Sequence, residues 1–440
     1  MLNSIQKAFK VKEVRERLLY TFMMLIVIRI GSCLPIPGVD ASFLREFFTN
    51  LQNSGMGFVN AITGGSFSNM SLFALSITPY ITSSIIMQLM TIAIPKLEEM
   101  QKEGEDGRKK IAEYTRYLTV GLALFESCAM AVGLGGKGLL LEDHRNVWGY
   151  LTVVAAMTAG SALLMWIGER ITDNGVGNGI SIVLLINIIS RVPDDFVTLY
   201  NQFMKGKSLA SAGLAAVIIL AIILVVVVFV IILQDGQRKI AVQYSQRIQG
   251  RRSVGGQSSF IPLKVNTAGV VPVIFASSLM QFPVVIASFL GKGNGKGIGS
   301  EILKGLSSNN WCNPEQLKYS WGLILYIVLT VFFAYFYTSI TFNPLEIANN
   351  MKKSGGFIPG IRPGKPTADY LTKILNYIIF IGAVGLIIVQ VIPFVFNGWL
   401  GANVSFGGTS LIIIVGVVLE TIKQIESQLL VRNYKGFLNK

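Results

Sequence analysis

Residues 214–233 read L-A-A-V-I-I-L-A-I-I-L-V-V-V-V-F-V-I-I-L, a stretch without a single charged or polar side chain. An α-helix needs about 20 predominantly apolar residues to cross the hydrocarbon core of a bilayer. This stretch therefore predicts a transmembrane helix, and it places the chain among membrane proteins.

The composition of the whole chain agrees with that assignment. Of its 440 residues, 52% are hydrophobic and 14% are charged, whereas soluble domains carry roughly 25% charged residues. A water-soluble enzyme is therefore excluded. The formal net charge of +14 predicts anionic partners, such as lipid headgroups, nucleic acid or acidic proteins.

Further apolar segments follow one another along the chain. Together with the first they occupy residues 18–34, 72–94, 117–134, 148–167, 180–190, 214–233, 267–290, 321–342, 374–396 and 409–422. The fifth segment is too short to cross alone, so we expect it to tilt, to begin deeper or to extend past Arg191, whose long side chain can reach the interface.

The lysines and arginines fix the expected orientation. Most of them fall on one side of the membrane if both termini are cytosolic, as the positive-inside rule requires, and an even number of spans agrees. The ten spans are compatible with two inverted halves of five, residues 1–195 and 196–440, a plan common in transport proteins.

Two long cytosolic loops, residues 234–266 and 343–373, are basic. The first contains Arg247, Arg251 and Arg252, and the second holds Arg362 and Lys365 in and beside the Pro/Gly-rich stretch 356–364. One interpretation is ordinary positive-inside charge. The other is a docking surface for an acidic protein or for RNA phosphates.

The first outside loop, residues 35–71, mixes glycines with apolar residues. It is either a surface loop packed on the bundle or a movable segment that folds back into the membrane, which is allowed where such a segment is buried in protein. The residues themselves favour neither interpretation.

Little in the chain suggests catalysis. The three cysteines form no C-x-x-C pair and His144 is the only histidine, so neither a metal site nor histidine-based catalysis is predicted. The one G-K-S, at residues 206–208, follows Asn201 where an ATP-binding Walker A motif has its first glycine. We expect no enzymatic activity and no cofactor.

Charged residues inside the predicted spans are few. They are Arg29, Glu126 and Glu420, and only Glu126 lies well within hydrocarbon depth. An ion-coupled transporter gathers several such groups near the midplane. An apolar pore, which blocks ions by dewetting and tolerates chemically diverse cargo, fits this chain better.

Four stretches resemble one known family: RIGSCLPIPGVD at residues 29–40, PYITSSIIMQL at 79–89, DNGVGNGIS at 173–181 and PLKVNTAGVVPVIFASS at 262–278. GIRPG at 360–364 and FGGTS at 406–410 extend the match. In these motifs and their order the chain resembles the SecY family, the pore-forming subunits of the bacterial Sec protein-conducting channel, over essentially its whole length.

The resemblance implies an all-α polytopic membrane protein with ten transmembrane helices in two pseudo-symmetric inverted halves, hinged between spans 5 and 6. Secretory proteins would cross its waist, and transmembrane segments would leave sideways into lipid between spans 2–3 and 7–8. The waist ring of the family falls on Ile81, Ile85, Leu184, Ile188, Val271, Ile274 and Ile413. In each of the first three pairs the spacing of three or four residues lets both side chains face one axis.

The resemblance also implies a plug, a lateral gate and partners. The plug corresponds to residues 57–70, with Gly57, Phe58, Ile62, Gly64, Gly65 and Phe67. Polar gate positions fall on Gln88, Glu126 and Ser278. Arg247, Arg251, Arg252, Arg362 and Lys365 would bind the motor ATPase SecA or ribosomal RNA. The helical subunits SecE and SecG, signal sequences, nascent polypeptides and membrane lipids complete the expected partners, in a bacterial plasma membrane.

Two alternatives remain open. A secondary transporter for a small solute would share the ten-span plan but would need convergent intramembrane charges. An accessory SecY-like channel for a restricted set of cargo would differ only in the range of proteins that it passes.

Overall fold

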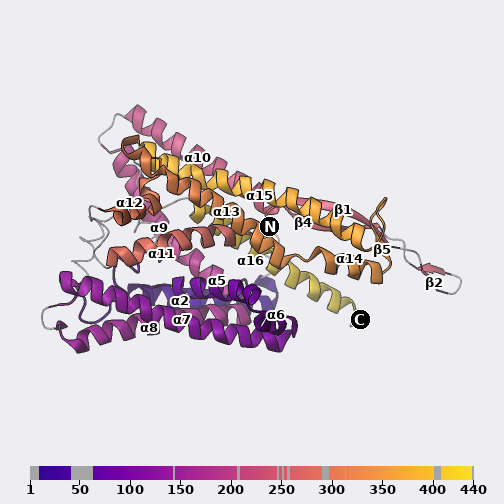
Figure 1. Ribbon diagram of the computed structural model, residues 1–440, viewed down its shortest axis with the longest axis horizontal. Helices are drawn as coiled ribbons and strands as arrows, with labels where there is room; N and C mark the ends of the chain where they lie inside the picture. The colour runs from indigo at the N-terminus through magenta and orange to yellow at the C-terminus, as the bar shows by residue number, and fades with distance from the viewer. Residues whose placement is uncertain are drawn as a thin grey trace.

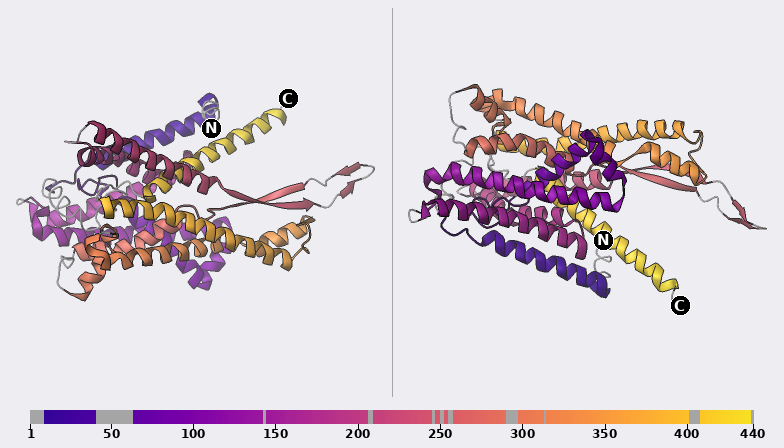
Figure 2. Two further views of the ribbon diagram at one scale, coloured as in Figure 1. Left: turned by 90° about the horizontal axis from the view of Figure 1, so that it is seen from above. Right: turned by 60° about the horizontal axis from the view of Figure 1, so that its bottom comes forward.

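The computed structural model describes residues 9–40, 63–141, 144–205, 209–244, 247–249, 252–254, 258–289, 297–312, 314–400 and 408–438. Long helices run side by side along the longest axis of the molecule (Figure 1), and a thin β-hairpin projects from one end of them. The start of α2 and the end of α16 lie toward that same end, whereas α12 (Ile298–Leu306) lies at the opposite end (Figure 2).

Each predicted apolar segment lies on a different helix. In chain order these helices are α2 (Lys12–Cys33), α5 (Thr78–Ala93), α7 (Glu105–Leu134), α8 (Val147–Asn174), α9 (Gly179–Phe203), α10 (Leu209–Asp235), α11 (Val271–Phe289), α13 (Trp321–Thr341), α15 (Lys365–Leu400) and α16 (Gly408–Leu438). The prediction of a mostly helical fold is confirmed.

By length and composition, four helical stretches within the described ranges are able to cross a membrane: Val147–Asn174, Ala212–Asp235, Leu317–Lys353 and Lys365–Ile392. A fifth candidate is α5 together with α6 (Pro95–Lys102), which follows it after a bend of 101°. Pro95 occupies the first position of α6, where its missing N–H costs nothing and its ring restrains the preceding residue from continuing the helix.

Two helices, α9 and α5, have boundaries that differ from those of the predicted apolar segments. The fifth segment extends past Arg191, and α9 continues through Pro193 to Phe203. The predicted division between residues 195 and 196 therefore falls inside this helix. Asn178 caps its start, because its side-chain oxygen accepts hydrogen bonds from the N–H groups of Ile180 and Ser181 at 3.1 and 3.3 Å. In the second segment, residues 72–77 form turns and α5 begins only at Thr78.

Contacts divide the helices into two groups. In the first, α7 packs on α5 and α8, and α8 packs on α2 and α9. In the second, α13 packs on α11 and α15, and α16 packs on α10 and α15. The groups meet where α11 contacts α5 and α7, and where α16 contacts α2 and α9, so α11 and α16 connect them.

The first basic loop folds into strands, which the sequence analysis did not predict. β1 (Gln237–Tyr244) pairs antiparallel with β4 (Ser258–Lys264), and the short strands β2 (Arg247–Gln249) and β3 (Arg252–Val254) pair beyond them. In β1, Ile240 and Val242 are buried between exposed neighbours, the period of two that characterises a half-buried strand. Their partners include Leu263, Met351 and Ile358.

The two basic loops are joined by a third strand. β5 (Gly356–Phe357) pairs antiparallel with the end of β1, Gln243 opposite Phe357 and Tyr244 opposite Gly356. Together with the short helix α14 (Pro344–Lys353), this brings both loops into one compact body at the hairpin end of the molecule (Figure 1).

Candidate functional site

Five of the seven predicted waist side chains lie in one apolar cluster where the two helix groups meet. They come from four helices: Ile81 from α5, Leu184 and Ile188 from α9, Ile274 from α11 and Ile413 from α16. Ile81 is partly buried, and the other four each expose at most 8% of their surface. An aliphatic junction of this kind offers an ion nothing to replace its hydration shell.

The other two predicted waist residues pack elsewhere. Ile85 and Val271 are partly buried against a neighbouring cluster that includes Phe275, Trp311 and Tyr326. Ile85 lies one helical turn beyond Ile81 on α5. The predicted ring residues are therefore divided between two clusters that are adjacent along that helix.

The described part of the predicted plug is its second half. Gly57, Phe58 and Ile62 lie outside the described residues, whereas Gly64, Gly65 and Phe67 lie within a series of turns, residues 63–70. Phe67 exposes 2% of its surface and packs with Ile36 and Met70 in a cluster that α7 and α8 complete. Residues 63–70, the described base of the predicted plug and called the plug base below, are thus buried against the first helix group.

A short bridge ties the base of the plug to the end of α2. Pro35 and Ser71 form an antiparallel bridge, the N–H of Ile36 donates to the carbonyl of Met70 at 3.0 Å, and the N–H of Leu72 donates to that of Leu34 at 2.9 Å. The sequence analysis missed this bridge and two polar residues of α9 beneath the plug base, Asn187 and Ser190. The presence of these two polar residues in an otherwise apolar span was the sequence signal that could have identified them.

The three predicted gate residues lie on helices that contact one another. Gln88 is on α5, Glu126 on α7 and Ser278 on α11, and all three side chains are partly buried. Helix α11 contacts both α5 and α7. The side-chain oxygen of Gln88 is buried without a hydrogen-bond partner among the described residues, which leaves a polar group at this seam unsatisfied.

The predicted docking residues lie at the hairpin end. Arg247 and Arg252 are in β2 and β3 near the tip of the hairpin, and Arg251 lies outside the described residues. Arg362 and Lys365 are exposed at the start of α15. The carbonyl of Arg362 accepts a hydrogen bond from the hydroxyl of Thr367 at 2.8 Å, which fixes the turn that presents its guanidinium to solvent.

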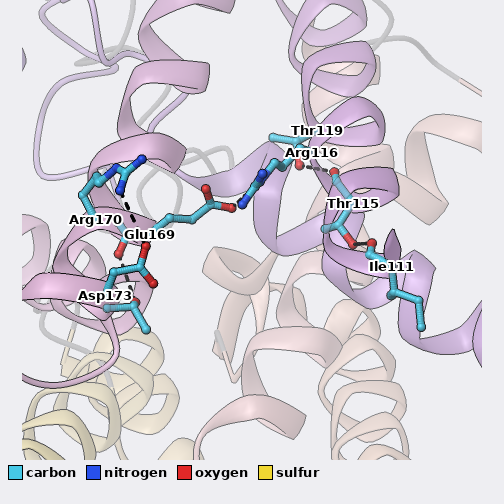
Figure 3. A network of polar contacts seen from close by, with 9 residues as sticks. Ile111, Thr115, Arg116, Thr119, Glu169, Arg170 and Asp173 are labelled. Carbon is cyan, nitrogen blue, oxygen red and sulfur yellow. Dashed lines mark hydrogen bonds and ion pairs between the residues drawn. The ribbon is translucent and has the colours of Figure 1, made fainter. Parts of the chain in front are cut away.

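A polar network joins α7 and α8 (Figure 3). The Nε of Arg116 on α7 donates to an Oε of Glu169 on α8 at 2.8 Å, and Arg170 pairs with Asp173 at 3.9 Å. Thr115 and Thr119, both buried, bond back to the carbonyls one turn earlier on α7. Their hydroxyls are thereby satisfied without disrupting the helix.

The site contains no recognisable metal centre within the described ranges, where no group of three or more His, Cys, Asp and Glu residues is placed to hold an ion. The candidate functional features are therefore an aliphatic junction, a buried glycine-containing segment beside it and a basic surface at one end of the molecule.

Comparison with known sequences gives consistent matches. A sequence model of the SecY family matches residues 71–422. The Streptomyces scabiei protein translocase subunit SecY is 45% identical over 451 residues, covering 100% of both chains. Its Corynebacterium glutamicum counterpart is 42% identical over 458 residues, covering 99% of this chain and 100% of its own.

Comparison with solved structures supports the same fold. A structure described as a protein conducting channel superposes with a TM-score of 0.61 at 18% identity, and the match covers 96% of each chain. A SecY structure from work on its plug domain gives a TM-score of 0.60, also at 18% identity and 96% coverage. Sec61 in the canine ribosome–channel complex gives 0.57 at 17% identity, again with 96% of each chain covered.

Proposed function

Because this chain belongs to the SecY family, we propose that it forms the central pore of a protein-conducting channel in a bacterial plasma membrane. It is a passive conduit for secretory polypeptides and releases transmembrane segments sideways into lipid. The observation that carries the proposal is the aliphatic junction of Ile81, Leu184, Ile188, Ile274 and Ile413, supplied by helices of both groups.

The junction suits a pore that must close to ions and open to polypeptides. Aliphatic side chains present no charge or hydrogen-bonding group, so they contact any passing residue without strong preference. The closed state is held by the burial of these side chains, at about 25 cal/mol per Å² of apolar surface. The plug base beside the junction supports the same role.

Gln88, Glu126 and Ser278 mark the lateral gate in this proposal. They lie on α5, α7 and α11, which are the helices that connect the two groups on one side of the junction. Polar side chains between these helices interact poorly with lipid. An apolar signal segment that separates the helices makes apolar contacts with the helices on both sides of the gate.

The exposed basic surface is where partners bind. The pairing of β1 with β5 places both arginine-containing loops on one body, which suits either a motor ATPase such as SecA or the RNA phosphates of a ribosome. Energy comes from these partners. SecE and SecG complete the complex, and both termini face the cytosol together with the hairpin.

Protease protection of a secretory precursor tests the proposal. The chain is reconstituted with SecE in liposomes and given SecA, ATP and a precursor. Protection that requires both ATP and a functional signal segment supports a general channel. If no precursor is protected although the complex binds SecA, the general channel is refuted. Protection of only a few precursors would instead indicate an accessory channel for restricted cargo.

A further inference from the structure

A polar pair on α9 lies directly beneath the base of the plug. The side-chain nitrogen of Asn187 donates to the hydroxyl of Ser76 at 3.0 Å. The hydroxyl of Ser190, one turn further on, lies 3.5 Å from the carbonyl of Gly64 and 2.7 Å from that of Asn187. Gly64 belongs to the base, and Ser76 ends the segment that connects the base to α5, so both ends of residues 64–76 meet the same turn of α9.

The contact between Gly64 and α9 is too close for any side chain. A Cβ at Gly64 would lie 2.8 Å from the carbonyl oxygen of Asn187 and 2.9 Å from the Oγ of Ser190. Gly64 also has a φ of +65° and Gly65 one of +82°, a region that glycine enters without steric cost. The backbone of the plug base therefore rests directly on the helix.

An arginine from a third element fixes the serine. An Nη of Arg29 on α2 donates to the Oγ of Ser190 at 2.9 Å. A charged donor makes a stronger hydrogen bond than a neutral one, and an arginine within a membrane span needs such a partner. Arg29 thereby fixes the position of the Ser190 Oγ, which lies against the backbone of Gly64 and donates its proton to the nearer carbonyl of Asn187.

The far end of the segment is held in a strained conformation. Ser76 has a φ of +52°, which a residue other than glycine adopts only when its surroundings hold it there. Ser76 exposes 1% of its surface and Asn187 exposes 2%, so their hydrogen bond is shielded from water. Asn187 also lies between Leu184 and Ile188, the two residues that α9 contributes to the waist.

We propose that Asn187, Ser190 and Arg29 form a polar clamp that holds the plug base against α9 in the closed channel, an inference that rests on the proposed channel function. Asn187 and Ser190 touch the segment itself, and Arg29 is a positioning residue that acts through Ser190. Three buried polar atoms at this place, the Oδ1 of Asn187, the Oγ of Ser66 and the Nε of Arg191, have no hydrogen-bond partner among the described residues. Of these atoms, the Asn187 Oδ1 belongs to the clamp, so the hydrogen-bonding capacity of the clamp is not fully used.

The first readout is the ion conductance of the resting channel, reconstituted with SecE in planar bilayers. Asn187→Leu removes the hydrogen bond to Ser76. Ser190→Ala removes the oxygen that contacts Gly64 and accepts from Arg29. Each variant should raise resting conductance about five- to tenfold. Ser190→Thr keeps the hydroxyl and should restore the original value. Thr158→Val is the matched control, because it removes the 3.0 Å Ser127–Thr158 hydrogen bond between α7 and α8.

The second readout separates release of the plug base from a general loss of structure. Ser66→Cys replaces a buried hydroxyl that has no hydrogen-bond partner in the described part of the chain by a thiol. The native cysteines, Cys33, Cys128 and Cys312, are replaced by serine in the same protein. Asn187→Leu and Ser190→Ala should each speed maleimide alkylation of that thiol about tenfold, and Thr158→Val should leave the rate unchanged.

The outcomes distinguish this proposal from the proposed function. If the original complex protects a precursor but both clamp variants match it in conductance and alkylation, the clamp is refuted and the channel stands. An equal change in the Thr158→Val control also refutes the clamp. If the original complex protects no precursor, the channel function itself fails.

Discussion

Replacement of Ile413 by asparagine is the sharpest test of the waist, because the neighbouring residue provides a control on the same helix. Ile413 exposes 1% of its surface within the junction of α5, α9, α11 and α16. Ile412 exposes 0% but packs in a different cluster, among Val226 and Val230 of α10 and Val389 of α15. The two residues are about equally buried, and in the proposed channel only Ile413 would become exposed when the waist opens.

The cost of the change in the closed state follows from burial. Loss of a fully buried isoleucine side chain removes about 2 kcal/mol of transfer free energy, and an amide left without a partner adds about 1–3 kcal/mol. At position 413 this total of about 3–5 kcal/mol disappears once the waist opens to water. Since 1.4 kcal/mol corresponds to a factor of ten, the ratio of open to closed channels should rise by a factor of about 10² to several times 10³.

Planar-bilayer recordings of the complex with SecE measure this ratio as resting ion leak. Ile413→Asn should leak strongly and Ile413→Leu should not. Ile412→Asn should lower the thermal stability of the complex without a comparable leak, since its cost is the same in both states. Equal leak from the Ile412→Asn and Ile413→Asn complexes, or none from either, would show that the junction is ordinary core and not the waist.

Three further perturbations test other parts of the molecule. Arg362→Glu should reduce SecA-driven precursor transport by about tenfold or more with unchanged helical content, and normal transport would exclude this docking contact. A double-mutant cycle on Arg116 and Glu169 in thermal unfolding should give a coupling of about 0.5–1 kcal/mol, and no coupling would mean that the network is dispensable. The ammonium of Lys318 lowers the pKa of Glu301, so this pair stabilises the segment around α12 above the ordinary carboxyl pKa and loses that contribution as pH falls through the lowered value. Fluorescence should show that segment loosening in acid, and Glu301→Gln should remove the pH dependence.

The membrane helices could be predicted from the sequence because the bilayer imposes a simple rule. Residues 214–233 and the other apolar segments each lie on one helix, since a span must satisfy its backbone internally. The boundaries were harder. Residues 72–77 are mostly apolar in sequence but form turns. Ser76, in these turns, has a positive φ and accepts a hydrogen bond from Asn187, far away in sequence, and no local pattern shows that contact.

The pattern of residues alone did not identify the residues of the candidate site. The junction residues were assigned through the family resemblance, since aliphatic pairs one turn apart are common in any helical core. The β-hairpin was missed because its short alternating stretch, with Ile240 and Val242 facing inward, is hidden among charged residues. The pairing of Tyr244 with Gly356 joins two loops more than a hundred residues apart, and no local pattern encodes it.

The hairpin has a mechanical consequence. β1 begins two residues after α10 ends, and β4 ends a few residues before α11 begins. At about 3.3 Å per residue, the eight-residue β1 is about 25 Å long, and its base is locked by a 2.8 Å hydrogen bond from the N–H of Val265 to the carbonyl of Gly236. In the proposed channel, a partner that pushes on β1 and β4 would transmit force along these paired strands toward the start of α11. That helix contacts α5 and α7, so force delivered outside the membrane would reach the seam proposed as the lateral exit of transmembrane segments.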